Sequence, residues 1–186
     1  MSESEDTKLV SEEVSTGVAH EAWASAARDL LIGTARRYHQ VIAVKDLAAG
    51  AQERTHLTST RRTHHWIGDV LELVAAECAA RGEPNLTSLC VNTEGGVGAS
   101  YARSVAAATG EEPTDPDAHA ATTRLACYVY FGATGLPANG GVAVLTPKLS
   151  ASRSRLRKAA LDARPVDTCP RCYIVLPAQG GCNNCD

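Results

Sequence analysis

The sequence predicts an α+β fold that is mainly helical, with a winged helix-turn-helix domain followed by a small four-cysteine zinc ribbon. Two observations lead to this prediction. Between residues 18 and 101 the expected order is helix, short strand, helix, helix, strand, glycine turn, strand, as in a winged helix. The chain then ends in two Cys-x-x-Cys pairs. The expected regions are a disordered acidic tail (1–16), the winged-helix domain with C-terminal helices (17–145), a basic linker (146–168) and the ribbon (169–186).

The first two helices and the strand between them are expected from apolar spacing. Residues 18–38 carry apolar side chains near the 3.6-residue helical period. Their buried stripe would consist of Trp23, Ala27, Leu30, Leu31 and Tyr38. The β-branched run at 41–44 predicts a short strand, and 45–54 predict a second helix that Gly50 weakens.

A third helix is expected over residues 60–81, with hydroxyl caps at 58–60 and a stop at Gly82. Its buried face would consist of Ile67, Val70, Leu71, Val74 and Cys78. Strands over 86–91 and 97–101, joined by a glycine turn, would form the wing. Two further helices are expected, over residues 102–108 and from Asp115-Pro116 to about Phe131.

Composition limits the class of protein. The chain has 186 residues, 44 % of them apolar, and a net charge of −3. We expect no membrane span, because no run of 18 apolar residues occurs, and no signal peptide, because the N-terminus is acidic. A cytoplasmic, nucleoid-associated protein is expected. Its seven cysteines are then interpreted as metal ligands and core residues, the latter being Cys78, Cys90 and Cys127.

The C-terminal cysteines have the spacing of a metal site. Cys169 and Cys172 form one Cys-x-x-Cys pair, and Cys182 and Cys185 form the other after nine intervening residues. Two such pairs complete a tetrahedral four-sulfur site for structural zinc, with no open position for catalysis. A redox-active pair, two disulfides or an iron–sulfur cluster are the alternatives.

The start of the expected third helix is the candidate DNA-binding surface. In a winged helix this helix enters the major groove of double-stranded DNA. Residues 36–65 have a net charge of +4 and residues 146–173 a net charge of +5, so basic residues cluster as phosphate binding requires. The candidate DNA contacts are Lys45, Arg54, Thr58, Ser59, Thr60, Arg61, Arg62, Thr63, His64 and His65, with Arg153, Arg155, Arg157 and Lys158 from the linker.

These residues also have simpler interpretations. A helix start rich in Ser, Thr and Arg can be only a capped, solvated surface. The basic residues 152–158 can be the solvated face of a linker helix. Trp66 is interpreted as a core anchor rather than a base-stacking residue. His64 and His65 lack a neighbouring carboxylate or cysteine to complete a metal site.

Several short motifs resemble a known family. They are Trp66-Ile67-Gly68, Gly82-Glu83-Pro84, residues 86–89 (LTSL) and Gly95-Gly96-x-Gly98. Over residues 20–135 the chain resembles actinobacterial winged-helix modules, found alone or fused to HNH-type nucleases, some of which read 5-methylcytosine in DNA. The resemblance implies DNA binding with a preference for modified cytosine, which we would place on residues 59–65.

The chain departs from that family in lacking an HNH nuclease half, so a stand-alone reader without catalysis is expected. A modification-dependent endonuclease component would need an open metal site, for which Asp115, Asp117 and His119 are the candidates. A zinc-ribbon protein–protein adaptor is the other alternative. A weaker resemblance to alkylguanine-repair proteins fails at Cys90, which lacks their Pro-Cys-His-Arg context.

Overall fold

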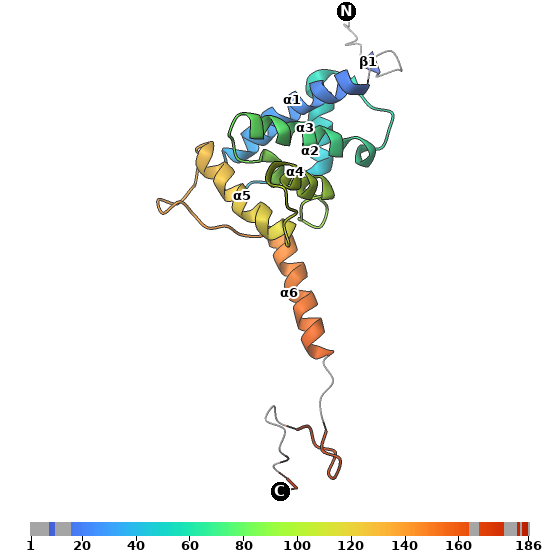
Figure 1. Ribbon diagram of the computed structural model, residues 1–186, viewed down its shortest axis with the longest axis vertical. Helices are drawn as coiled ribbons and strands as arrows, with labels where there is room; N and C mark the ends of the chain where they lie inside the picture. The colour runs from blue at the N-terminus through green and yellow to red at the C-terminus, as the bar shows by residue number, and fades with distance from the viewer. Residues whose placement is uncertain (1–7, 10–15, 164–167, 177–181, 183, 186) are drawn as a thin grey trace, which may run out of the picture. The chain divides into compact units, whose positions relative to one another are not determined.

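The computed structural model describes residues 8–9, 16–163, 168–176, 182 and 184–185 (Figure 1). They divide into two compact units, the first ending at Leu149 and the second beginning at Ser150. The described residues are mainly helical. The helices are α1 (Thr16–Ala35), α2 (Val44–Thr55), α3 (Ile67–Ala80), α4 (Ala99–Thr109), α5 (Pro116–Tyr130) and α6 (Pro147–Asp162), with the 3₁₀ turns η1 (Thr63–His65) and η2 (Leu86–Leu89).

The core of the first unit lies where α1 packs on α2 and α3 (Figure 1). Trp23 of α1 and Trp66 are each 2 % exposed, and their rings lie 4.4 Å apart between centroids. The predicted stripe of α1 is buried at Trp23, Ala27 and Leu31 and partly buried at Leu30 and Tyr38. The predicted buried face of α3 is confirmed at all five positions, Ile67, Val70, Leu71, Val74 and Cys78.

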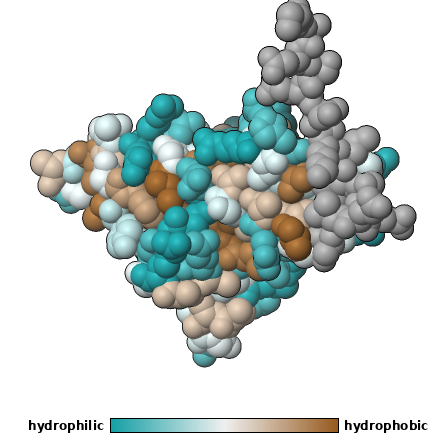
Figure 2. All heavy atoms as spheres, turned by 90° about the horizontal axis from the view of Figure 1, so that it is seen from above, coloured by the Kyte–Doolittle hydropathy of each residue, from teal (hydrophilic) through white to brown (hydrophobic). Residues whose placement is uncertain are grey.

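Small side chains fill most of the remaining core. α1 buries five alanines and α2 buries Ala48 and Ala51, which allows the helices to approach closely. The predicted core cysteines Cys78, Cys90 and Cys127 are all buried. On the face drawn in Figure 2, hydrophobic residues lie in small patches between hydrophilic ones.

The strands are short and all pair in parallel. They are β1 (Lys8–Leu9), β2 (Ile42–Ala43), β3 (Leu57–Thr58) and β4 (Cys90–Val91). β1 pairs with β3, and β2 pairs with β4 with Ile42 opposite Cys90. β2 follows α1 and β4 follows η2, so their pairing holds the start of α2 beside the loop that follows β4.

The predicted wing is wrong, and a winged helix is not confirmed. Residues 86–89 form η2, and the expected return strand at 97–101 lies partly in α4. Two causes override the strand pattern. β4 pairs in parallel with β2 instead of forming a hairpin, and α4 contains five alanines, the residue with the highest helix propensity.

The predicted start of the third helix is also wrong. α3 begins at Ile67, after the 3₁₀ turn η1 and after Trp66, whose φ of −132° lies outside the helical range. The Trp66 side chain packs into the core against Trp23, so the chain has to bend there before the helix can begin. Residues 58–65 are therefore strand, loop and 3₁₀ turn.

The ends of the chain meet the predictions only in part. Most of the expected acidic tail (1–16) lies outside the described residues, although Lys8–Leu9 form β1. The basic linker predicted at 146–168 is helical over 147–162, and α6 buries none of its side chains. In the second unit, Thr168 and Val175 form an antiparallel bridge, while the expected glycine turn of the ribbon lies outside the described residues.

Candidate functional site

A groove of about 880 Å³ lies in the first unit, between the start of α3, the loop after β4 and the start of α4. Apolar side chains form part of its lining: Val44, Ile67, Leu71, Val91, Ala99 and Tyr101. Polar side chains line the rest: Thr63, Thr87, Asn92, Thr93 and Ser100. The parallel pairing of β2 with β4 places the start of α2 and the Asn92–Thr93 loop on the same groove.

Four basic side chains line the same groove. Arg103 forms an ion pair with Glu72 at 2.7 Å, and the Lys148 ammonium donates a hydrogen bond to the Thr93 carbonyl. Lys45 and His64 are exposed, and neither forms an ion pair with any residue that the structure describes. The groove therefore combines apolar side chains, hydroxyl groups, an exposed imidazole and a lysine without a counter-ion among the described residues.

The structure brings three of the sequence-predicted DNA contacts together in this groove, Lys45, Thr63 and His64. His65 is exposed beside it, with its ring 4.0 Å from that of His64 between centroids. Arg61 and Arg62 are exposed just before η1 and do not line the groove. Arg54 is exposed in the last turn of α2.

The loop from 58 to 62 is held by local hydrogen bonds. The Ser59 amide donates to Gln52 Oε1 at 2.7 Å, and the Arg61 amide donates to Ser59 Oγ at 3.2 Å. Thr60 is exposed, whereas Thr58 Oγ1 is buried and has no hydrogen-bond partner among the described residues. Of the hydroxyl groups predicted to contact DNA here, Ser59 Oγ already accepts a hydrogen bond within the loop, and Thr58 Oγ1 is buried.

Sequence reasoning missed Arg103, Lys148 and Ser100 as groove residues. They follow the predicted cluster by 35 residues or more, and no local motif marks them. Asn92 was missed because the wing prediction placed it in a strand–turn junction. Its Oδ1 accepts hydrogen bonds from the amides of Glu94 and Gly96, which shapes the loop beside the groove.

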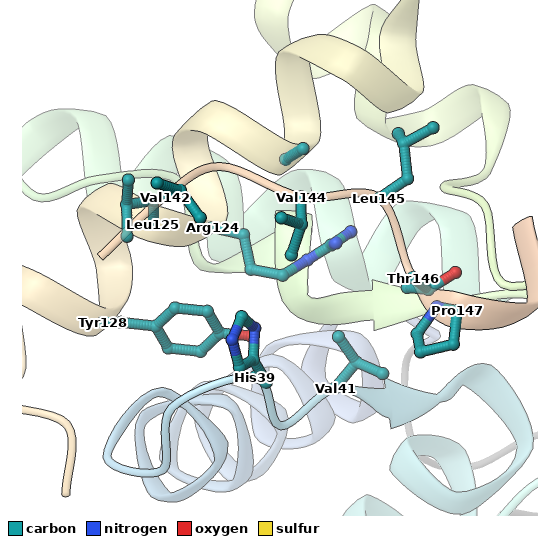
Figure 3. A pocket seen from close by; sticks show the side chains of 11 residues that line it. His39, Val41, Arg124, Leu125, Tyr128, Val142, Val144, Leu145, Thr146 and Pro147 are labelled. Carbon is teal, nitrogen blue, oxygen red and sulfur yellow. The ribbon is translucent and has the colours of Figure 1, made fainter. Parts of the chain in front are cut away.

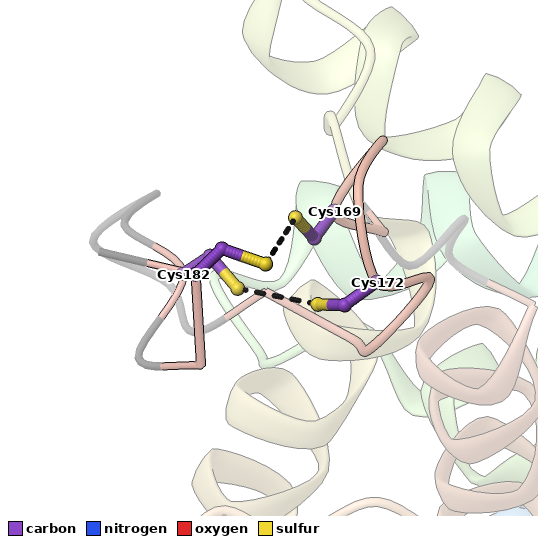
Figure 4. A group of neighbouring side chains, drawn as sticks. Cys169, Cys172 and Cys182 are labelled. Carbon is purple, nitrogen blue, oxygen red and sulfur yellow. Dashed lines mark hydrogen bonds between the residues drawn. The ribbon is translucent and has the colours of Figure 1, made fainter.

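The four C-terminal cysteines lie together in the second unit (Figure 4). Their sulfur atoms are all within 4.8 Å of one another. Cys169 Sγ and Cys185 Sγ are 3.9 Å apart, and Cys172 Sγ and Cys182 Sγ are 3.5 Å apart. These separations are far longer than a disulfide bond of about 2.05 Å, so the predicted pairs form a cluster that could hold a metal ion.

Backbone amides stabilise the thiolate form of the first pair. Hydrogen bonds from the amides of Cys172 and Arg171 lower the pKa of Cys169. A backbone hydrogen bond from Ile174 lowers the pKa of Cys172 to about 6, and side-chain hydrogen bonds, the largest with Cys172, raise that of Cys185 to about 11. Thiolates that lie this close together are suited to bind a cation.

The residues considered for a nuclease site have structural partners. Asp115 caps α5 by accepting hydrogen bonds from the amides of Asp117 and Ala118. Asp117 Oδ1 accepts from the Val97 amide at 2.9 Å, and His119 Nδ1 lies 2.8 Å from the Tyr101 hydroxyl. Within the described residues, no group of three metal-binding side chains is found besides the four cysteines.

The basic residues of α6 are surface groups of the second unit. Arg155, Arg157 and Lys158 are exposed, and Arg153 is half-buried. Within the described part of the chain, no helix is long and apolar enough to cross a membrane. No family model, no curated protein and no solved structure matches this chain.

Proposed function

We propose that this chain binds double-stranded DNA through the face of the first unit that carries Lys45, Arg61, Arg62 and His64, with a preference for 5-methylcytosine. The observation that carries the proposal is the groove that Lys45 and His64 line, where an exposed lysine without a counter-ion among the described residues stands next to hydroxyl groups and apolar side chains. Exposed, unpaired cations bind phosphates, and this binding supplies a large share of the affinity for DNA.

The groove also suits a methylated base. Hydrogen-bonding side chains such as Thr63, Asn92 and Ser100 can meet the polar edge of a base, and Ile67 and Ala99 offer apolar contact to a methyl group. Apolar contact is how proteins recognise the thymine methyl group in the major groove, and 5-methylcytosine carries a methyl at the same ring position. A preference for methylated DNA therefore needs no further chemistry than this groove offers.

The metal that fits the C-terminal cluster best is zinc. Four sulfur ligands at about 2.3 Å from a tetrahedral zinc ion lie about 3.8 Å apart. The sulfur atoms of Cys172 and Cys182 lie 3.5 Å apart and those of Cys169 and Cys185 lie 3.9 Å apart, which agrees with that geometry. The site would be structural, because four thiolates leave no position for water or substrate. We accordingly assign the chain no catalytic activity of its own.

The basic helix α6 would then supply additional phosphate contacts. Arg155, Arg157 and Lys158 are exposed, and the metal cluster follows them at the end of the same unit. Contacts of this kind add affinity without sequence information. Base preference would reside in the groove of the first unit, and the metal-bound tail would add affinity.

The test is fluorescence anisotropy on the full chain with three matched duplexes, carrying cytosine, 5-methylcytosine or 5-hydroxymethylcytosine at the same position. We expect binding to all three that weakens steeply with salt, and tightest binding to the 5-methylcytosine duplex. Absence of duplex binding at low salt would overturn the proposal and favour an adaptor. Equal affinity for all three would remove the methyl preference.

Two further measurements accompany the binding assay. The same duplexes are incubated with Mg²⁺ and Mn²⁺, and cleavage products would contradict the assignment as a reader without catalysis. Elemental analysis of the purified chain is expected to give one zinc per chain. Iron, or an iron–sulfur absorption band in the visible range, would contradict the zinc assignment.

A further inference from the structure

A second cavity, of about 420 Å³, lies in the first unit between α5 and the segment 142–147 (Figure 3). Its walls are largely apolar and are formed by Val41, Ala121, Leu125, Val142, Val144, Leu145 and Pro147. Arg124 of α5 is the fixed charge in this lining. Figure 3 shows its side chain crossing the cavity beside Val144.

Arg124 is a buried cation whose donors are only partly used. It is 5 % exposed, and its Nε and Nη2 both donate to the Ser88 carbonyl, at 3.1 and 3.0 Å. A guanidinium has five N–H donors, so three remain after these two bonds. No carboxylate of the described residues forms an ion pair with it.

The surroundings do not neutralise this charge at close range. Burial lowers the pKa of Arg124, and the nearby Tyr128, Tyr101 and Asp117 oppose that shift only through longer-range attraction. Among these groups Asp117 carries the formal negative charge, and its Oδ1 already accepts from the Val97 amide. A buried cation without a close anion is costly, and a bound anion would offset that cost.

The two hydroxyl groups of the lining already donate hydrogen bonds within the protein. The Tyr128 hydroxyl donates to the Gln40 carbonyl at 2.7 Å, and the Thr146 hydroxyl donates to the Gly95 carbonyl at 2.7 Å. His39 is exposed at the rim, with a left-handed φ of 64°. Apart from His39 at the rim, the cavity thus offers free N–H donors at Arg124 and mainly apolar side chains elsewhere. A ligand that fits it carries hydrogen-bond acceptors, a negative charge and an apolar body.

We propose that this cavity binds a compact carboxylate with an apolar body, such as a single aromatic ring or a branched aliphatic chain. The carboxylate would accept hydrogen bonds from the free N–H groups of Arg124, the geometry in which a guanidinium binds carboxylates most strongly. The apolar body would contact Val142, Val144 and Leu145. The volume of about 420 Å³ lies in the range of about 300–1,000 Å³ that is typical of small-molecule sites.

The test uses benzoate as the probe, with benzamide and inorganic phosphate as the two comparisons. Benzamide has the same ring without the charge, and phosphate has the charge without the ring. Isothermal titration calorimetry on the full chain is expected to show saturable binding of benzoate only. In a ¹⁵N-labelled sample, the Nε–H signal of Arg124 is expected to shift with the same saturation curve.

Variants separate the cavity from non-specific binding. Val144→Trp fills the cavity from a segment outside the helices, and is expected to abolish benzoate binding without unfolding the chain. Val129→Trp is the matched control, because Val129 is exposed on α5 and does not line the cavity. This variant is expected to bind benzoate as the unmodified chain does.

Three outcomes would overturn the proposal. The first is that benzoate shows no saturable binding at concentrations up to about 10 mM, since a dissociation constant in the millimolar range already means weak binding. The second is equal binding of benzoate and benzamide, which would mean that Arg124 takes no part. The third is unchanged binding in Val144→Trp, which would place the probe elsewhere. None of these outcomes depends on whether the chain binds DNA.

Discussion

Replacing both Arg61 and Arg62 with alanine tests the DNA-binding face directly. Both side chains are exposed, and neither forms an ion pair with a described residue. Each phosphate contact contributes about 0.9 to the slope of log K against log salt, so the double variant should lose about 1.8 from that slope. If the two affinities converge near 1 M salt, the variant binds about 60-fold more weakly at 0.1 M.

The matched control is the double variant Arg36→Ala and Arg37→Ala, which removes the same charge from another adjacent arginine pair. Trp23 of α1 donates a hydrogen bond to the Leu57 carbonyl, next to the predicted face. Arg36 follows Trp23 by 13 residues, about 20 Å further along the helix axis. The control should therefore reduce the slope less than the Arg61 and Arg62 double variant does.

The assay is anisotropy of a labelled duplex between 50 and 200 mM salt, with circular dichroism to check folding. Over that range the unmodified chain should lose about twelvefold more affinity than the Arg61 and Arg62 double variant. An unchanged slope in this variant would refute the assignment of the face. An equal loss in the control would mean that only net charge matters.

The remaining predictions concern the metal, pH and the core. Chelating the metal should weaken duplex affinity, while the ratio of affinities for methylated and unmethylated duplexes stays constant in the same anisotropy assay. If that ratio falls to one, the C-terminal tail takes part in recognising the modified base. Burial raises the pKa of Cys90 and Cys127 to about 12 from an ordinary 9.0, so the unfolded chain releases these protons first. The free energy of unfolding, measured by urea titration, should therefore fall as the pH rises from 9 to 12. Below pH 9 these thiols are protonated in both states and add no pH dependence. A flat profile between pH 9 and 12 would contradict their burial. Trp66→Ala should cost about 3–5 kcal/mol in urea unfolding, whereas Leu73→Ala on the exposed side of α3 should cost much less; similar losses would refute the Trp23–Trp66 anchor.

Helical periodicity predicted the core of this fold because burial on one helix face leaves a regular trace in the sequence. The buried face of α3 followed from that trace. The interpretation of Trp66 as a core anchor agrees with its burial, although periodicity did not supply it. The Asp115 cap and Pro116 at the start of α5 followed from local hydrogen-bonding chemistry. The cysteine cluster was predictable because two Cys-x-x-Cys pairs place four thiols near one point.

The wing and the groove could not be predicted in the same way. Strand pairing depends on which distant segment is available, and β4 pairs with β2 from about 48 residues earlier. Arg103 and Lys148 reach the groove through tertiary packing and leave no local pattern. The burial of Arg124 was not predicted, because nothing near it in the sequence indicates the Ser88 carbonyl that accepts its hydrogen bonds.

The glycine turn predicted at Gly95-Gly96 is present, but it is not part of a wing. A β-carbon at Gly95 would lie 2.4 Å from Thr146 Oγ1, and φ there is +83°; one at Gly96 would lie 2.8 Å from Asp117 Oδ1. Gly95 needs glycine because its φ is positive and Thr146 lies close, and a β-carbon at Gly96 would displace the Asp117 carboxylate. Neither requirement comes from the tip of a wing. Thr146, which lines the Arg124 cavity, donates a hydrogen bond to the Gly95 carbonyl, and Lys148, which lines the groove, donates one to the Thr93 carbonyl. The turn therefore binds one lining residue of each cavity.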